Sequence, residues 1–132
     1  VQAPPPGGNE HVMIVDDDPD NLELEKDILQ SLGYRVFMSD HPEDVIRQFR
    51  ENPQQADLVL SDLLMPRMTG VEMMRELLQI RRDLPVLICS GHSEATAEED
   101  ARRAGARDFL RKPLDIHLLA LAIRKELDRK AG

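Results

Sequence analysis

The sequence predicts an α/β fold, a doubly wound parallel sheet in which five strands alternate with five helices along the chain. The first observation behind this prediction is that short apolar runs of strand length alternate with longer segments whose apolar residues recur at helical spacing. The second is that three of the apolar runs end in polar residues near turn signals: Asp16, Asp62 and Ser90. The length of 132 residues suits one domain of this kind.

The first ten residues, VQAPPPGGNE, differ in composition from the rest of the chain. They combine prolines and glycines with almost no bulky apolar side chain, so this segment can bury little apolar surface. We therefore expect residues 1–10 to be a disordered linker or tail, and the folded domain to span residues 11–130.

The first strand is expected over the apolar run 11–15, and a helix follows it. Asp18 and Pro19 are typical of a helix N-cap and a first helical residue, and Gly33 is typical of a helix end. The apolar residues between them fall close to one helical stripe: Leu22, Ile28, Leu29 and Leu32.

The second and third strands differ in pattern. Residues 34–39 alternate apolar and polar side chains only weakly, which indicates a strand that is partly covered. A helix is expected over 42–51, and the next apolar run, 57–62, predicts a strand that ends at a carboxylate. Apolar residues at helical spacing then predict a helix that begins at Thr69 or Gly70 and ends at Arg82.

The last part of the chain repeats this alternation, with strands expected over 86–90 and 106–111. The helix expected between them, 93–104, has an inward face made mostly of alanines, so it should pack weakly: Ala97, Ala101 and Ala104. The last helix has a full apolar stripe: Ile116, Leu119, Ile123 and Leu127. Leu118 and Leu121 widen that stripe toward a possible contact surface.

The apolar content of the strands predicts their order in the sheet. The first, third and fourth strands are apolar throughout, as strands buried on both faces are, whereas the second and fifth are mixed and belong at the edges. With right-handed crossovers the order is 2-1-3-4-5, the flavodoxin-like arrangement, whose switch point lies between the first and third strands. The carboxylates that follow those two strands then meet at one crevice: Asp16, Asp17 and Asp62.

Clustered carboxylates repel one another unless a cation joins them. Mg²⁺ prefers oxygen ligands and usually keeps several waters, so two or three carboxylates at a strand edge suit it, with Mn²⁺ as an alternative. Asp18 has the simpler role of a helix cap.

Two further polar residues reach the same edge of the predicted sheet: Ser90 ends the fourth strand and Lys112 follows the fifth. Alone, the first could be a strand-ending hydroxyl and the second a solvated surface lysine. Together with the carboxylates they form a site for a phosphoryl group, because Mg²⁺ and an ammonium neutralise its charge while an aspartate oxygen is a competent nucleophile. This combination favours phosphoryl transfer to Asp62.

As a set, these residues resemble the response-regulator receiver domains of two-component signalling, over about residues 11–129. The resemblance implies that Asp62 is the phosphoacceptor. It also implies a set of magnesium ligands in which the first binds directly or through water: Asp16, Asp17, Asp62 and the backbone carbonyl of Leu64. The phosphate-binding and switch positions would be Ser90, Lys112 and Phe109.

The resemblance further implies a Lys112–Pro113 peptide that is often cis in the family, and a phosphodonor that is a histidine kinase or its phosphotransfer domain. Phosphorylation would switch a face built by the fourth helix, the fifth strand and the last helix, through which a homodimer could also form. The domain would be a phosphoacceptor with at most slow self-dephosphorylation, not an enzyme in its own right.

Composition excludes several other classes. A formal charge of −8 argues against direct nucleic-acid binding through a general phosphate field. The single cysteine, Cys89, lies inside an apolar run and predicts a buried core thiol in a reducing compartment. The longest apolar runs have strand length, so we expect no membrane insertion and a cytoplasmic location.

Two rival functions remain open at this point. An aspartate-based phosphatase would use Asp16 as nucleophile and Asp18 as acid and base, and a pseudo-receiver would have the fold without phosphorylation. Leu64 and His92 depart mildly from the family pattern, which bears on the lifetime of the phosphorylated state. The stretches 1–10 and 88–94 are similar to receivers fused C-terminally to hybrid sensor kinases, which predicts a kinase as the parent chain.

Overall fold

Strands and helices alternate as the sequence predicts in the computed structural model, which describes residues 4–91 and 95–131. The strands are β1 (His11–Val15), β2 (Arg35–Ser39), β3 (Leu58–Asp62), β4 (Val86–Ser90) and β5 (Asp108–Arg111). The helices are α1 (Pro19–Ser31), α2 (Pro42–Glu51), α3 (Gly70–Ile80), α4 (Ala95–Ala104) and α5 (Ile116–Ala131).

The five strands form one sheet in the order β2-β1-β3-β4-β5, and every pair is parallel, which confirms the predicted order. In the register of the central pair, Val15 of β1 lies opposite Ser61 of β3. The residues that follow these two therefore lie side by side at the carboxyl edge of the sheet. They are Asp16 and Asp62, so the register itself assembles the predicted crevice.

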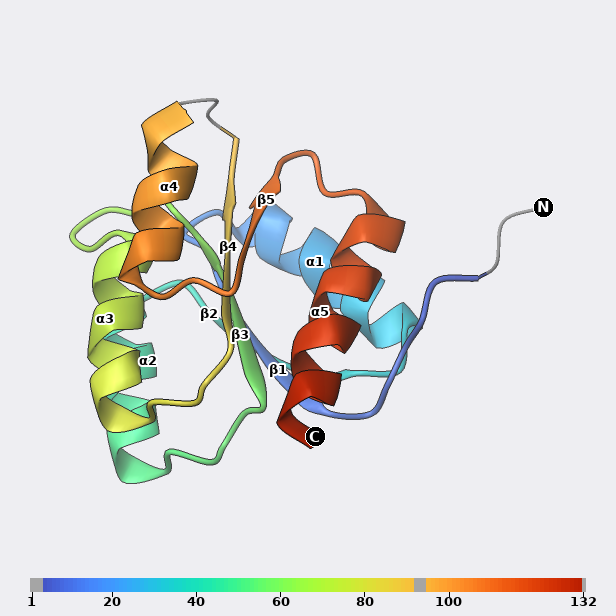
Figure 1. Ribbon diagram of the computed structural model, residues 1–132, viewed down its shortest axis with the longest axis horizontal. Helices are drawn as coiled ribbons and strands as arrows, with labels where there is room; N and C mark the ends of the chain where they lie inside the picture. The colour runs from blue at the N-terminus through green and yellow to red at the C-terminus, as the bar shows by residue number, and fades with distance from the viewer. Residues whose placement is uncertain (1–3, 92–94, 132) are drawn as a thin grey trace.

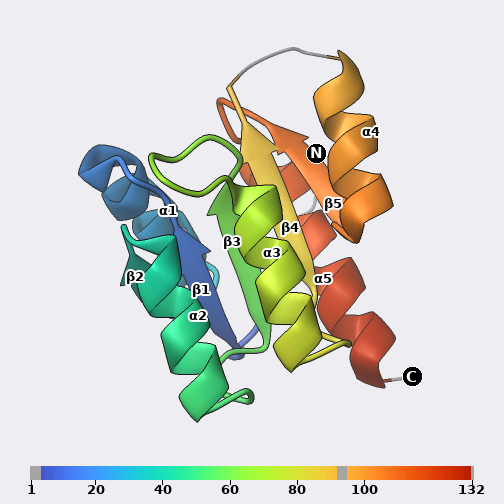
Figure 2. The same cartoon turned by 90° about the vertical axis from the view of Figure 1, so that its left-hand side faces the viewer.

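Helices cover both faces of the sheet, with α1 and α5 on one side and α2, α3 and α4 on the other (Figure 1). Figure 2 shows the second side, where α2 and α3 lie across the strands and α4 beside β5. Each side has its own apolar core. One joins Phe49 of α2, Leu77 of α3 and Ala101 of α4 to the sheet, and the other joins Leu29 of α1 and Ile123 of α5 to it.

The helix starts follow from local side-chain chemistry. The Asp18 carboxylate accepts a hydrogen bond of 2.9 Å from the backbone N–H of Asp20, so the predicted cap of α1 is confirmed. Thr69 and Glu72 form a reciprocal capping box at the start of α3, with bonds of 2.9 and 3.1 Å. Gly33, after α1, has φ of 100°, a conformation that favours glycine.

Ile116 was expected in the buried stripe of α5 but is 38% exposed at the first residue of the helix. The helix expected from 93 begins at Ala95, and residues 92–94 lie outside the described residues. The single cysteine, Cys89, is fully buried as predicted.

Part of the segment expected to be a linker contacts the domain. The backbone N–H of Gly8 donates to the Leu32 carbonyl at 3.0 Å, and the Arg124 guanidinium of α5 donates to both carboxylate oxygens of Glu10 at 3.0 and 2.7 Å. These contacts hold residues 8–10 against the C-terminal end of α1 and the middle of α5. The boundary between tail and domain at residue 11 stays a prediction.

Candidate functional site

Asp62 ends β3 and is held by the backbone on both sides. The N–H of Leu63 donates to the Cys89 carbonyl of β4, and the N–H of Gly70 donates back to the Leu63 carbonyl, both at 2.8 Å. Gly70 lies so close to the Asp62 carbonyl that a Cβ there would collide with it. The start of α3 is therefore packed directly against the backbone of Asp62, whose side chain keeps 13% exposure.

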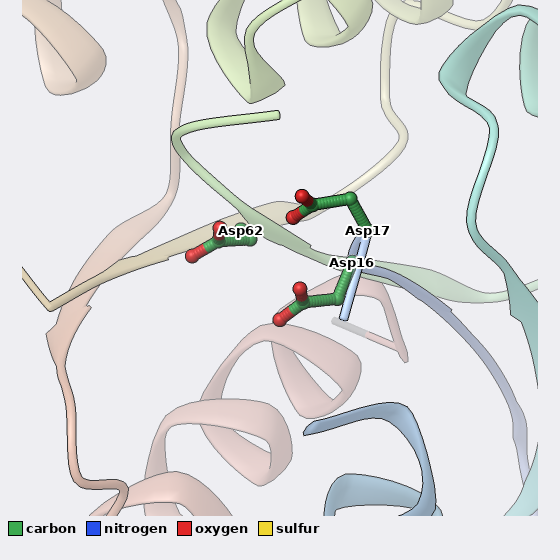
Figure 3. A group of neighbouring side chains, drawn as sticks. All are labelled: Asp16, Asp17 and Asp62. Carbon is green, nitrogen blue, oxygen red and sulfur yellow. The ribbon is translucent and has the colours of Figure 1, made fainter. Parts of the chain in front are cut away.

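Asp16 and Asp17 come from the turn after β1 and complete a group of three carboxylates, whose oxygens lie within 4.8 Å of one another. Figure 3 shows the three side chains pointing toward a common space. Asp16 is buried, Asp17 is exposed and Asp62 is intermediate. This donor set fits Mg²⁺, because hard oxygen ligands converge while the exposed side leaves room for water and a phosphate oxygen.

Lys112 lies between two of these carboxylates. Its Nζ is 2.9 Å from Oδ2 of Asp16 and 3.1 Å from Oδ1 of Asp62. The backbone N–H of Lys112 donates to the Ser90 carbonyl at 2.9 Å, so the ends of β4 and β5 are tied together beside the crevice. The Lys112–Pro113 peptide is cis, which confirms what the resemblance implied.

The electrostatics of the site follow from this crowding. Burial raises the pKa of Asp62 above its usual value, and the contacts with Lys112 oppose the rise. The charges of Asp16 and Asp17 add to the rise, because like charges disfavour ionisation. For Lys112, burial lowers the pKa, but the hydrogen bonds to Asp16 and Asp62 outweigh it and raise the pKa above its usual value. A second cation in the crevice would favour the ionised, nucleophilic form of Asp62.

The remaining predicted site residues lie around this centre. Ser90 is 2% exposed at the end of β4. Phe109 of β5 is 6% exposed and packs in the core shared with α3 and α4, with the Arg111 guanidinium 5.8 Å from its ring centre. Leu64 lies in the loop after β3 with an exposed side chain. The switch role of the phenylalanine and the ligand role of the Leu64 carbonyl stay predictions.

Sequence reasoning missed one buried acidic residue near the site, Glu25 of α1, which is 3% exposed. It lies three residues after Leu22 and four before Leu29, so it occupies the same buried stripe of the helix. An acidic residue at an apolar stripe position was the available signal. Glu25 and Lys112 line the same cleft between α1 and the loop before α5.

Comparison with known proteins agrees with this geometry. Residues 12–124 match the family described as the response regulator receiver domain. The chain belongs to this family. In sequence it is 33% identical over 119 residues to the transcriptional regulatory protein ZraR of Escherichia coli K12, a match that covers 90% of this chain and 26% of that protein. The chain therefore spans about a quarter of the length of this relative, which has further regions of its own.

Two solved receiver domains are similar in structure. One, from Clostridium thermocellum, is 30% identical with a TM-score of 0.87, and the match covers 92% of this chain and 97% of that one. The other belongs to a sensor histidine kinase of Pseudomonas aeruginosa PAO1 and is 24% identical with a TM-score of 0.82, covering 92% and 99%. At that identity the second likeness shows the fold alone. The predicted fusion of this chain to a hybrid kinase stays a prediction.

In the part of the chain that the structure describes, no helix has the length and apolar character needed to cross a bilayer.

Proposed function

We propose that this receiver domain accepts a phosphoryl group on Asp62 from the phosphohistidine of a histidine kinase or its phosphotransfer domain. The observation that carries the proposal is the position of Lys112, whose ammonium contacts Asp62 and Asp16 at 3.1 and 2.9 Å beside a third carboxylate. A carboxylate nucleophile next to a fixed cation and a hard-metal donor set is suited to phosphoryl transfer.

The reaction forms one bond and breaks one. An oxygen of Asp62 attacks phosphorus, the phosphorus–nitrogen bond of the donor breaks, and the imidazole leaves and takes up a proton. Lys112 pairs with the phosphoryl oxygens and the Ser90 hydroxyl donates to one of them. Mg²⁺ held by Asp16, Asp17, Asp62 and the Leu64 carbonyl would neutralise charge on the transferred group. The Pseudomonas receiver is described with a magnesium ion in its active-site cleft.

The output surface in this proposal is the face of α4, β5 and α5. α4 is held to the core by alanines, so few apolar contacts oppose its rearrangement, while Leu118 and Leu121 of α5 are 61% and 54% exposed. This face would bind a partner protein or a second copy of the domain. Under the proposal the domain acts in the cytoplasm, without inserting in a membrane or contacting nucleic acid itself.

The domain acts as a phosphoacceptor with at most slow self-dephosphorylation. Against the phosphatase alternative, the Asp18 carboxylate that would serve as acid and base is bound to the backbone of Asp20 as a helix cap. The Asp16 side chain that would be the nucleophile is 1% exposed, whereas the Asp62 side chain keeps 13% exposure.

Incubation with acetyl phosphate and Mg²⁺, followed by mass spectrometry, tests the proposal. We expect one phosphoryl group on Asp62, no labelling of Asp62→Asn at that site, and no labelling in excess chelator. Steady phosphate release that depends on Asp16 would instead support a phosphatase, and no modification at all a pseudo-receiver.

A matched pair of neighbouring aspartates tests the metal assignment. Asp17→Asn removes a carboxylate of the crevice, whereas Asp18→Asn changes only the helix cap, which asparagine can still provide. We expect the first variant to weaken Mg²⁺ binding strongly and the second to leave it nearly unchanged. Equal Mg²⁺ affinities in a titration of the two variants would contradict the ligand assignment.

A further inference from the structure

The side chain of Glu25 is almost fully buried in α1. It is 3% exposed in the middle of α1, and it makes no hydrogen bond or ion pair with any residue among 4–91 and 95–131. An unpaired carboxylate in an apolar layer destabilises a fold, and an apolar side chain would fill this stripe position better. Glu25 lies in the helix that directly follows Asp16 and Asp17, so a destabilising group at this position calls for a functional explanation.

The cleft that Glu25 lines also contains Lys112. Its volume is about 420 Å³, and its walls are mainly apolar: Leu24, Ile28, Pro113 and Leu114. Burial raises the pKa of Glu25 to about 7, and Lys112 is the cation whose charge opposes that rise. The carboxylate and the ammonium thus act on one another across a largely apolar space, in which charge interactions are strong.

Lys112 is paired with other carboxylates in the structure. Its Nζ contacts Asp16 and Asp62 at 2.9 and 3.1 Å, and both belong to the proposed magnesium site. A divalent cation bound there competes with Lys112 for the same oxygens and repels its ammonium. Glu25 is then the carboxylate that lines the same cleft as Lys112 and is available to pair with its ammonium.

We propose that Glu25 is a positioning residue that receives the Lys112 ammonium when Mg²⁺ occupies the crevice and releases it when Asp62 is phosphorylated. The release step rests on the proposed function, whereas the capture step concerns Mg²⁺ alone. Glu25 therefore stabilises the magnesium-bound, unphosphorylated form and opposes the phosphorylated one, because Lys112 must leave it to reach the phosphoryl oxygens.

The proposal predicts two changes of opposite sign in Glu25→Gln, which keeps the shape of the side chain and removes its charge. Mg²⁺ affinity, measured by titration without any phosphate donor, falls about fivefold because the displaced lysine loses its second partner. Affinity for beryllium fluoride at saturating Mg²⁺ rises about fivefold because nothing holds Lys112 back. A change that only perturbed packing would move both affinities in the same direction or neither.

Two controls make the test specific. Glu23→Gln removes a carboxylate from the same helix, but Glu23 is exposed and paired with Lys26 at 2.8 Å, so both affinities should stay as in the wild type. Introducing Glu25→Gln into a Lys112→Ala background should have no further effect on either affinity, since Glu25 acts only through that ammonium. Glu25→Leu, which suits the apolar stripe, provides a second uncharged variant if the glutamine variant folds poorly.

Parallel or absent changes in Glu25→Gln, or effects that persist in the Lys112→Ala background, overturn the inference. If the wild type fails to bind beryllium fluoride at all, the proposed function fails, and the magnesium titration then judges the capture step by itself. A weaker Mg²⁺ affinity in Glu25→Gln but not in Glu23→Gln supports capture, and equal affinities refute it.

Discussion

Helices α3 and α4 lie on the same face of the sheet but are held to it very differently. α3 begins with a capping box and buries the side chains of Met73, Met74 and Leu77 completely. Among the α4 side chains whose burial is described, Ala101 is fully buried, and Ala97 and Ala104 are partly buried beside it. Apolar burial contributes about 25 cal/mol per Å², so alanines anchor α4 far less than the long side chains anchor α3.

This difference separates the part of the domain that holds the site from the part that could report its state. α3 packs directly beneath Asp62, since Gly70 at its start lies against the Asp62 carbonyl. A rigid support of this kind keeps the nucleophile in place, whereas a weakly anchored helix can rearrange at small cost. Side-chain size thus determines how firmly these neighbouring helices are anchored to the sheet.

The largest expected effect is an all-or-none difference in hydrogen exchange. With beryllium fluoride and Mg²⁺, we expect amide protection to change in α4 but not in α3, because only α4 can move cheaply. Chelation of Mg²⁺ should abolish the change. Ser90→Ala should retain phosphate uptake but lose the change in α4, because it removes the hydroxyl that links the phosphoryl group to β4.

Equal changes of amide protection in α3 and α4 would contradict the expectation that α4 rearranges more easily than α3. The full change in Ser90→Ala would show that the signal reaches α4 by another route. Phe109 matters here because its ring is already buried. Transmission of the change from Asp62 to α4 therefore does not require the Phe109 ring to move from solvent into the core.

The next largest effect is on stability. Leu77→Ala should lower the free energy of unfolding by about 2–5 kcal/mol, because it leaves a cavity in the core. Ala97→Gly in α4 should cost only about 1 kcal/mol, the helix-propensity difference. Urea denaturation of both variants measures the two values, and a cost in α4 as large as that in α3 would show that α4 is firmly anchored.

Most of this architecture was predictable because it follows from periodic patterns. Apolar runs and helical stripes gave the elements and the strand order, and the edge positions followed from the mixed patterns of β2 and β5. The group of Asp16, Asp17 and Asp62 was predictable because parallel strands bring their carboxyl ends to one edge.

What could not be predicted depends on distances between elements. The contact of Lys112 with Asp16 as well as Asp62, and the buried position of Glu25, depend on how α1 and the loop before α5 pack, which no local pattern specifies. Similarly, composition suggested a loose tail over 1–10, yet Glu10 is held by Arg124, a residue 114 positions later. A long-range ion pair of this kind leaves no trace in local composition.

A smaller effect concerns the cap of α3. Thr69→Ala removes the hydroxyl that accepts from the Glu72 N–H and should cost about 1 kcal/mol, because a helix N–H group loses its partner. Thr69→Ser keeps the hydroxyl and serves as the control, with little loss expected. Thermal unfolding of the two variants measures the difference. An equal loss in both would indicate that the cap does not contribute to the anchoring of α3.

The smallest expected effect lies in the loop that joins β3 to α3. Arg67 has φ of 74°, in the left-handed region where a side chain is strained. Its ion pair with Glu43 is 3.8 Å long and both side chains are exposed, so the pair contributes little. Arg67→Gly relieves the strain but loosens the unfolded chain, and we expect a net gain of about 0.5 kcal/mol.

Two further variants separate backbone strain from the ion pair. Arg67→Ala keeps a Cβ at the positive φ and removes the pair, so it should not stabilise the domain, and Glu43→Gln, which removes only the pair, should change stability by less than about 0.5 kcal/mol. Chemical denaturation of the three variants decides the sign. A gain in Arg67→Ala equal to that in Arg67→Gly would mean that the arginine side chain, not the backbone, carries the cost. In that case the positive φ at position 67 would carry no strain, and the loop between Asp62 and α3 would accept any small side chain there.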